Sequence, residues 1–562
     1  MITAPPALGT QTIPSLWQYV LDRRLAAPAY LEEQADGWRE VSWAEAAERV
    51  DALGKALLAR GVKHGDAVVV LARTRLEWLL LDWAIMSIGA VVVGLYPTNT
   101  AAECSYIVGH AEAVLAFVEN EEQYEKLASV FGGPIVKFTE IPGFEAEGRS
   151  YDGPPASPVA EDDVATLIYT SGTTGPPKGV ILSHRNLVAA ASRATSSTNE
   201  DDVVLLFLPM AHSFARIAHQ GSAFNGATVS LVSDVARVPE ALQRTRPTFL
   251  PAVPRVYEKI HANTLGEIER AGGLRTTLGR WALRVGARVS AKRRAGERVS
   301  PLDVLQERVA DRLVFAKVKQ RLGGRLRMAV SGAAPLSLDV LEFFNSLGIL
   351  VVEGYGLTET SSSLSVNQED NFKLGTVGPP VVDCLVKLDA DGEILVKSPT
   401  VFAGYHKDSD ATAAAFTEDG WFRTGDVGEI DEDGFLKITD RKKDLIITAG
   451  GKNIAPQNIE NALKVSRFVS QAVAIGDRRP YVTALITLDW DEVNASGRDA
   501  QELVQEIVDD VNRDRVRVEQ VKRFAILPRD FTQEEGELTP TLKLRRRVVQ
   551  EHFADEIEQL YT

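Results

Sequence analysis

Cysteine is scarce in this sequence: the 562 residues contain only Cys104 and Cys384. Two distant cysteines without metal-ligand spacing exclude a disulfide-rich fold and a thiolate zinc site, and they fit a reducing compartment.

A long uninterrupted apolar segment is also missing. The best candidate, 78–96, contains Asp82 and Gly89 and is expected to form a buried helix followed by a strand. The first residues lack a basic region followed by an apolar stretch, so we expect no signal peptide and a cytoplasmic protein.

Positive charge is in deficit, with 62 Lys and Arg against 77 Asp and Glu and a net charge of −15. Such a chain is not expected to bind nucleic acid. The segment 280–298 is a basic exception, in which Arg280, Arg284 and Arg288 recur every four residues. It is either a solvated helical face or a docking surface for anionic lipid at the inner face of a membrane.

Length and patterning predict several domains of the α/β class. Short β-branched runs alternate with helical patterns, which favours largely parallel sheets flanked by helices. After residue 385 the pattern changes to short strands and Asp-Gly turns, typical of a smaller β-rich region, and a strand–helix pattern resumes from Asp440. The expected strands are 67–71, 114–118, 203–208, 228–232, 328–331 and 349–353, and the expected C-terminal helices are 458–464 and 499–511.

The segment "YTSGTTGPPKG", 169–179, combines glycine, proline and hydroxyl side chains around one lysine. Glycine and proline weaken helices and central strands, whereas a loop of small donors around a cation suits a polyphosphate. We expect a strand over 165–169 before the loop and a helix over 184–194 after it. Lys178 follows Pro177 and precedes Gly179, so the loop is not the G-x-x-x-x-G-K-[ST] motif of P-loop ATPases.

Further motifs follow in a fixed order. They are "LPMAHSFAR" (208–216), "VSGAAPLS" (330–337), "EGYGLTET" (353–360), "WFRTGD" (421–426), "DRKKDLIITAGGKNIAPQNIE" (440–460) and "LTPTLKLRRR" (538–547). With these motifs the chain resembles the AMP-forming acyl-CoA synthetases of the adenylate-forming superfamily over nearly its full length. Within that superfamily it is most similar to the long-chain fatty-acid–CoA ligases.

The resemblance implies a reaction in two steps. A fatty-acid carboxylate attacks the α-phosphate of ATP to give acyl-AMP and diphosphate, and the thiol of CoA then displaces AMP. It implies a large N-terminal ATP- and acyl-binding domain, 1–440, of parallel and mixed sheets flanked by helices, with a small β-rich subdomain. A small mobile α+β C-terminal domain, 441–562, would follow. ATP, Mg²⁺, CoA and a long-chain fatty acid are the expected ligands.

The same resemblance assigns roles to individual residues. Lys543 would approach the α-phosphate, Glu359 would bind Mg²⁺, Thr358 would touch the α-phosphate, His212 would lie near the acyl carboxylate, and Lys443 would be the hinge. The phosphate loop would be Thr170, Ser171, Gly172, Thr173, Thr174, Gly175 and Lys178. The adenine pocket would comprise Gly332, Ala333, Ala334, Glu353, Gly354, Tyr355 and Gly356; Asp426 and Arg441 would hold the ribose, and Gly450, Gly451 and Lys452 would border the pantetheine tunnel.

Two departures from the family pattern bear on mechanism and substrate. Leu542 precedes Lys543 where many relatives have glycine, and no tryptophan follows His212, so the closure of an acyl tunnel and the preferred chain length stay open. His212 could equally be a packing residue. The alternatives are a CoA ligase for medium-chain or aryl acids, a fatty acyl-AMP ligase that transfers to a carrier protein, and a non-catalytic nucleotide- or lipid-binding scaffold. Oligomeric state and pathway are likewise open.

Overall fold

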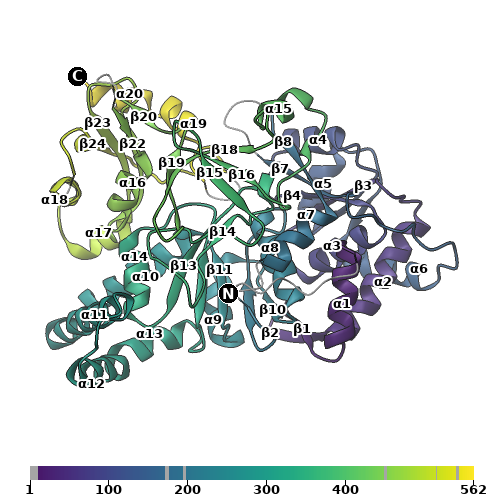
Figure 1. Ribbon diagram of the computed structural model, residues 1–562, viewed down its shortest axis with the longest axis horizontal. Helices are drawn as coiled ribbons and strands as arrows, with labels where there is room; N and C mark the ends of the chain where they lie inside the picture. Colours follow the sequence, from purple (N-terminus) through teal and green to yellow (C-terminus); the bar gives the residue numbers. More distant parts are fainter. Residues whose placement is uncertain (1–9, 171–175, 194–197, 449–451, 514, 540–542) are drawn as a thin grey trace.

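The computed structural model describes residues 10–562 apart from 171–175, 194–197, 449–451, 514 and 540–542. Figure 1 shows the N-terminal residues (purple and blue) on the right and the C-terminal residues (yellow) at the upper left. The small β-rich region lies between them. None of the described helices is long and apolar enough to cross a bilayer.

Two sheets organise the N-terminal part. The first has seven strands in the order β17-β8-β7-β4-β3-β5-β6. Its central strands pair in parallel and are buried on both faces, as their runs of valine and leucine predict. The strands are β3 (Ala67–Leu71), β4 (Val91–Leu95), β5 (Leu115–Val118), β6 (Ile135–Lys137), β7 (Val164–Thr170), β8 (Lys178–Ser183) and β17 (Gly404–Tyr405).

The second sheet has eight strands in the order β14-β13-β12-β11-β9-β10-β1-β2. The pairs β13–β14 and β1–β2 at its two ends are antiparallel, and the pairs between them are parallel. The strands are β1 (Pro28–Gln34), β2 (Gly37–Ser42), β9 (Val203–Leu206), β10 (Thr228–Leu231), β11 (Phe249–Ala252), β12 (Met328–Ser331), β13 (Leu350–Tyr355) and β14 (Ser365–Val366). The α/β class and the mixed sheets are therefore confirmed.

Smaller sheets complete the described chain. The β-rich region is a four-stranded antiparallel sheet of β15 (Leu385–Leu388), β16 (Glu393–Lys397), β18 (Phe422–Ile430) and β19 (Leu436–Arg441). The C-terminal part contains a sheet of β22 (Val469–Ile475), β23 (Val482–Leu488) and β24 (Val521–Ile526) and a short pair, β20 (Ile446–Ile447) with β21 (Asn453–Ile454).

Helices cover these sheets (Figure 1). In the first 150 residues they are α1 (Ile13–Arg24), α2 (Trp43–Ala59), α3 (Leu76–Ser87), α4 (Ala101–His110), α5 (Glu121–Ala128) and α6 (Ile141–Arg149). The middle of the chain forms α7 (His184–Arg193), α8 (Ser213–Phe224), α9 (Val238–Thr245), α10 (Pro254–Arg270), α11 (Gly273–Arg294), α12 (Pro301–Ala310), α13 (Ala316–Arg321), α14 (Leu338–Ser346) and α15 (Ser409–Ala414). The C-terminal helices are α16 (Pro456–Lys464), α17 (Trp490–Ser496), α18 (Ala500–Arg513), α19 (Arg546–His552) and α20 (Ala554–Gln559).

The strand expected before the glycine-rich loop and the helix expected after it are confirmed as β7 and α7, but a strand between the loop and the helix was not expected. The loop joins β7 to β8, which pair antiparallel with Thr170 opposite Lys178, and α7 begins only after β8. The apolar residues of β8, Val180 and Leu182, are buried, but they directly follow the Gly-Pro-rich run, so the sequence pattern merges them with the loop. Lys178 is thereby fixed at the first position of a strand.

Separate apolar clusters fill the two parts of the chain. The largest draws only on residues between Ile13 and Phe422, whereas two others use only residues from Ile446 onward. Independent cores are what a division near residue 440 requires. The division into 1–440 and 441–562 remains our prediction, and this distribution of apolar contacts supports it.

Close backbone packing between α2 and α6 provides a test of the N-terminal core. A Cβ added to Gly148 of α6 would lie 1.8 Å from the Ala52 carbonyl oxygen of α2, whereas one added to Gly143 of the same helix meets nothing within 4 Å. Overpacking of this kind costs about 1–3 kcal/mol. We expect Gly148→Ala to lower the free energy of unfolding by at least that amount in urea denaturation. Gly143→Ala is the matched control and should be neutral or slightly stabilising; equal effects of the two substitutions would contradict this packing.

Candidate active site

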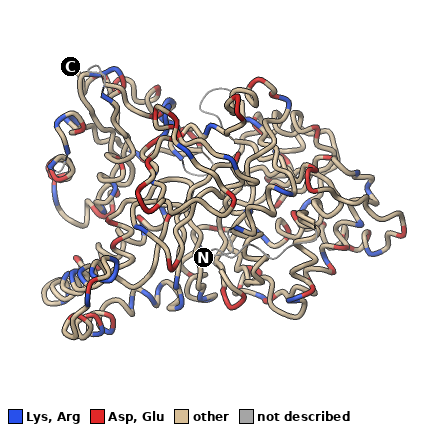
Figure 2. Tube along the Cα trace, viewed as in Figure 1, with Lys and Arg blue, Asp and Glu red and all other residues tan. Residues whose placement is uncertain are grey.

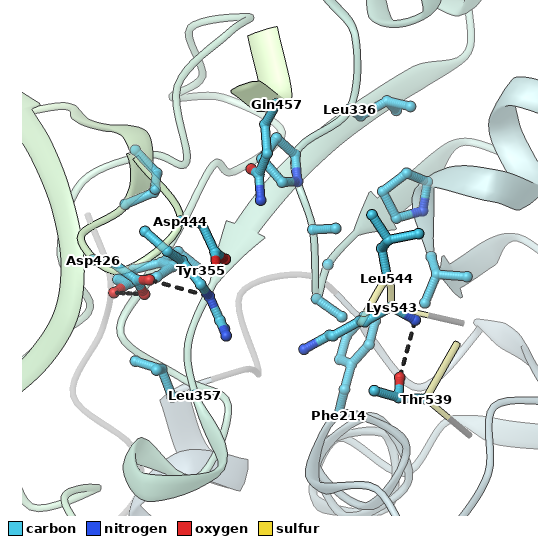
Figure 3. Close-up of a pocket in the computed structure, with 18 of the residues that line it drawn as sticks. Phe214, Leu336, Tyr355, Leu357, Asp426, Asp444, Gln457, Thr539, Lys543 and Leu544 are labelled. Carbon is cyan, nitrogen blue, oxygen red and sulfur yellow. Dashed lines mark hydrogen bonds and ion pairs between the residues drawn. The ribbon is translucent and has the colours of Figure 1, made fainter. Parts of the chain in front are cut away.

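A cavity of about 2450 Å³ lies between the N-terminal part and the C-terminal part, and both contribute to its lining. Figure 3 shows part of it, with Tyr355 and Asp426 on one side and Lys543 with Thr539 on the other. The expected site residues that line this cavity are Thr170, Lys178, His212, Gly332, Ala333, Ala334, Glu353, Gly354, Tyr355, Gly356, Thr358, Glu359, Asp426, Arg441, Lys443 and Lys543. Motifs spread over more than half the chain thus meet in one space.

Asp426 is a buried carboxylate with a partner on each oxygen. The Tyr355 hydroxyl donates to Oδ2 at 2.7 Å, and Arg441 Nε lies 3.4 Å from Oδ1. Asp426 and Arg441 are direct cross-strand partners on β18 and β19, so the sheet register itself places them together. Burial raises the pKa of Asp426, and the Arg441 guanidinium and the Tyr355 hydroxyl oppose part of that rise. Each oxygen keeps a further lone pair with which to accept a hydrogen bond from a ligand hydroxyl.

Glu359 is held by a residue that the sequence analysis did not identify. The Tyr405 hydroxyl donates to Glu359 Oε1 at 2.9 Å, and Lys178 Nζ lies 4.8 Å from the centre of the Tyr405 ring. β17 pairs with β8 and so brings Tyr405 beside Lys178. Burial and the neighbouring Glu359 carboxylate raise the pKa of Tyr405, which keeps its hydroxyl protonated as a donor. A single aromatic residue in a two-residue strand carried no pattern from which this role could be predicted.

Thr358 lies in a tightly folded turn. Its hydroxyl oxygen is 3.4 Å from Ser213 Oγ, which in turn lies 2.5 Å from Ser362 Oγ. Ser361 and Ser362 are consecutive non-glycine residues in the left-handed region, with φ of 51° and 59°. A Cβ on Gly356 would lie 2.4 Å from the Ser362 carbonyl carbon, so only glycine allows the turn to close on itself. The structure therefore gives Gly356 a packing requirement in addition to its place on the cavity.

His212 is half-buried at the start of α8. Its Nδ1 accepts a hydrogen bond from the Phe214 N–H at 3.1 Å and caps the helix. Burial, with a smaller contribution from the Lys543 charge, lowers the pKa of His212 to about 3. The ring is therefore neutral at physiological pH, and because Nδ1 accepts, the proton resides on Nε2. This nitrogen can donate a hydrogen bond to an anion in the cavity.

The loop after β12 is supported by Glu353. Ser331 and Glu353 are cross-strand partners, and Glu353 Oε1 accepts from the Leu336 N–H at 2.9 Å. Burial raises the pKa of Glu353 to about 7. Ala333 has φ of 73°, and a Cβ on Gly332 would lie 3.1 Å from the Phe214 ring. Glu353 thus shapes the wall of the cavity through the backbone of this loop.

Lys543 brings a cation from the C-terminal part into the cavity. Its backbone is held by Thr539, whose N–H donates to the Lys543 carbonyl at 2.8 Å and whose hydroxyl accepts from the Lys543 N–H at 3.0 Å. Burial lowers the pKa of Lys543 to about 8; Arg441 adds to this effect, whereas Asp426 and Glu359 oppose it. The Lys543 charge therefore interacts with Asp426 and Arg441 of the small β-sheet and with Glu359 in the turn after β13.

The segment that connects the two parts is held to the small β-sheet by Lys442. The Lys442 N–H donates to the Gly425 carbonyl at 2.9 Å, and Lys442 Nζ lies 2.5 Å from Asp391 and 3.0 Å from the buried Glu393. Asp389, Asp391 and Glu393 form the one group of three close carboxylates in the described residues, and Lys442 and Arg423 neutralise it. Lys443, whose pKa is lowered by burial and by Arg441, is the first residue after this anchor.

Some predicted residues do not join the cavity. Lys452 is exposed and does not line it; its N–H donates to Thr448 Oγ1 at 3.2 Å across a turn, and its place near a pantetheine tunnel remains a prediction. Other predicted residues lie outside the described part of the chain, namely Ser171, Gly172, Thr173, Thr174, Gly175, Gly450 and Gly451.

Comparison with known proteins identifies the family. The model of the AMP-binding enzymes matches residues 18–406, and the model of the AMP-binding enzyme C-terminal domain matches 443–562. The chain belongs to the AMP-binding enzyme family. The family's C-terminal model thus begins one residue after the anchored Lys442.

Individual relatives give a more detailed comparison. The chain is 39% identical to the long-chain-fatty-acid–CoA ligase FadD15 of Mycobacterium tuberculosis, over 93% of this chain and 92% of the relative. It is 32% identical to human long-chain-fatty-acid–CoA ligase 1, over 93% of this chain and 82% of the relative. Among solved structures, the adenylation domain of a Mycobacterium chelonae carboxylate reductase superposes with a TM-score of 0.80 at 24% identity. That match covers 100% of this chain and 92% of the other, and it shows the shared fold.

The lowered pKa of Lys543 predicts an alkaline limit for adenylation. The cationic form is the one that attracts a phosphate, and it is lost as pH rises through about 8. We expect kcat/KM for acid-dependent ATP–diphosphate exchange to fall about tenfold per pH unit above that value, since kcat/KM reports the free enzyme. Lys543→Arg keeps its charge and should shift the fall to higher pH.

The control is the second half-reaction, measured from supplied acyl-AMP and CoA over the same pH range. A steady rate of exchange across the alkaline range in the wild-type protein would contradict the role of the Lys543 charge.

Proposed function

We propose that this protein is a long-chain fatty-acid–CoA ligase that forms acyl-CoA, AMP and diphosphate through an acyl-adenylate. The observation that carries the proposal is the convergence of Lys543, Asp426 and Glu359 in one cavity. Relatives named long-chain-fatty-acid–CoA ligases align over 93% of the chain, and their name supports the acyl substrate.

The first step requires neutralisation of charge around the α-phosphate, because a carboxylate is a poor nucleophile toward a polyanion. Lys543 and Lys178 supply ammonium groups, and the neutral His212 offers Nε2–H to orient the attacking carboxylate. Asp426 accepts from the ribose hydroxyls while Tyr355 and Arg441 hold it in place. The carboxylate oxygen then bonds to the α-phosphorus and diphosphate leaves.

Glu359 fits a magnesium ligand. Tyr405 donates to Oε1, and no hydrogen bond to Oε2 is present within the described part of the chain. Mg²⁺ is commonly bound by one or two carboxylates together with substrate phosphates. When bound there, the ion would neutralise phosphate charge. The residues of this chain that position the carboxylate for that purpose are Tyr405 and the turn around Thr358.

The second step needs a different arrangement of the same site. Lys543 must withdraw so that the CoA thiol can reach the acyl carbonyl and displace AMP. We assign the movement to the C-terminal part, 441–562, turning about Lys443, because Lys442 is anchored to the small β-sheet by its N–H and its ammonium group. A rotation of this kind uses a few backbone torsions at the boundary between two cores.

One face of α8 favours a long acyl chain. Phe214, Ile217, Ala218, Gly221 and Ser222 all line the cavity, beginning beside His212. Eight residues of helix rise span roughly 12 Å, the scale of an extended chain of about ten carbons. Each buried methylene contributes about 0.8 kcal/mol, so a lining of this length rewards long acids over short ones.

A panel of acids tests the substrate class. We expect hexadecanoate to give a higher kcat/KM for thioester formation than acetate or benzoate, since its methylenes fill the apolar lining. Diphosphate release and thioester formation should be measured together, with and without CoA. Equal or faster turnover of acetate or benzoate would show that the long-chain assignment is wrong, and diphosphate release without any thioester would point to transfer to another acceptor.

Two substitutions should separate the half-reactions. Lys443→Pro fixes φ near −65° at the proposed hinge. We expect it to leave acyl-AMP formation near the wild-type rate and to slow thioester formation by about tenfold or more, a barrier of at least about 1.4 kcal/mol. Lys543→Ala should do the reverse and lose adenylation while still converting supplied acyl-AMP and CoA.

Lys443→Ala is the matched control for the hinge, because it removes the same side chain without restricting the backbone. If Lys443→Pro and Lys443→Ala behave alike, or if each substitution slows both steps equally, the hinge assignment fails. The chemistry of the first step would stand in either case.

A further inference from the structure

The helical hairpin of α11 and α12 projects at the lower left of Figure 1, and Lys and Arg are dense along it in Figure 2. Its second arm is longer than α12 alone. α12 continues through a π-helical turn, Asp311–Phe315, into α13, and the residues at each junction keep right-handed helical torsions. The segment 301–321 is therefore one continuous helical arm.

Acidic side chains of this arm are turned toward neighbouring basic residues of the protein. Asp303 is buried and contacts Arg288 at 3.1 Å and Lys292 at 2.8 Å. Glu307 contacts Arg293 at 2.6 Å, and Asp311 contacts Lys319 at 2.7 Å. The negative charges of the arm are thus already neutralised within the protein.

The exposed side of the arm has the opposite character. Leu302, Leu305, Val309 and Leu313 are 62%, 59%, 40% and 44% exposed, at spacings of three and four residues that place them along one side of the helix. Arg308, Arg312 and Lys317 are exposed as well, whereas the acidic residues of 301–321 are all in ion pairs. We call the outward face the set Leu302, Leu305, Arg308, Val309, Arg312, Leu313 and Lys317.

Arg308, Arg312 and Lys317 form no ion pair with any residue in the part of the chain that the structure describes. The basic stretch 280–298 differs in this respect. Arg280 contacts Glu269, Arg288 and Lys292 contact Asp303, and further residues of α11 are paired with Glu307 and Glu342. Most of the basic residues that the sequence analysis noted in 280–298 therefore form ion pairs within the protein.

We propose that the outward face docks on the surface of a membrane that contains anionic lipid. Leucine and valine interleaved with arginine and lysine, on an arm whose carboxylates are all paired, is the composition of helices that lie in a bilayer interface. The apolar side chains would enter the acyl boundary while the unpaired cations contact lipid phosphates. Each basic residue near an anionic leaflet strengthens partitioning roughly fivefold. Contiguous exposed apolar residues on a protein surface mark interaction sites. Because the charged residues of this face are cationic, it favours a negatively charged surface as its partner.

The test is co-sedimentation of the full chain with vesicles of phosphatidylcholine, with or without phosphatidylglycerol. We expect binding that depends on phosphatidylglycerol. Leu302→Gln/Leu305→Gln should weaken it about tenfold or more through lost apolar contact, and Arg308→Gln/Arg312→Gln should weaken it by a similar factor through lost charge. Added salt should reduce binding of the first variant more steeply than that of the second.

Two matched controls carry the same chemical changes elsewhere. Leu385→Gln/Val516→Gln removes apolar side chains that are 61% and 63% exposed, and Arg280→Gln/Arg284→Gln removes two charges from α11. Both controls should bind as the wild-type protein does. Circular dichroism melting of all variants establishes that each is folded.

Other outcomes would overturn the proposal. They are a wild-type protein that ignores phosphatidylglycerol vesicles, controls that lose as much binding as the face variants, and face variants that bind unchanged. Sedimentation velocity tests the remaining alternative, in which a second copy of the chain binds to the outward face. If the wild-type protein self-associates through the outward face and does not bind vesicles, the face pairs with a second copy of the chain and the lipid proposal is wrong.

Discussion

The cavity depends on a buried carboxylate that must keep its charge. Asp426 lies under the surface, where burial raises its pKa, and it is supported by one hydrogen bond from Tyr355 and one ion pair with Arg441. Tyr355 ends β13 of the eight-stranded sheet, whereas Arg441 ends β19 of the small sheet. Both contacts stabilise the charge of Asp426, and the one with Tyr355 also joins the small sheet to the large one. The chain crosses to the C-terminal part directly after this point, so the position of Lys543 also rests on it.

Strained backbone torsions occur on the wall of the same cavity. Ala333 and Ser362 line it, and both have left-handed torsions that a side chain disfavours, as does the adjacent Ser361. Such conformations cost of the order of 1–3 kcal/mol each and persist only where the surroundings enforce them. Here the Glu353 carboxylate holds the loop that follows Ala333, and Gly356 admits the turn at Ser362. The cavity wall is thus shaped before a ligand arrives.

Predictions from sequence succeeded where a residue's environment is set locally. The strands 67–71 and 328–331 were placed to the residue, because buried β-branched runs with clear ends admit few alternatives. β8 was missed because its pairing with β7, a tertiary contact, overrides the loop-like composition beside it. The cavity residues lie in motifs and could be named in advance, whereas Tyr405 became visible only through the pairing of β17 with β8. Ion pairs on α11 were equally invisible, since their partners lie on other helices.

The crowding of like charges around Lys543 has a consequence for the order of events in the proposed reaction. Burial is the main cause of its lowered pKa; repulsion from Arg441 and Lys443 adds to this effect, whereas Asp426 and Glu359 oppose it. A triphosphate would supply the missing negative charge and hold the lysine in place. Once diphosphate has left, most of that counter-charge is gone and the cations again repel one another. Departure of the first product would then itself release the C-terminal part, and the enzyme would need no separate signal to begin its second step.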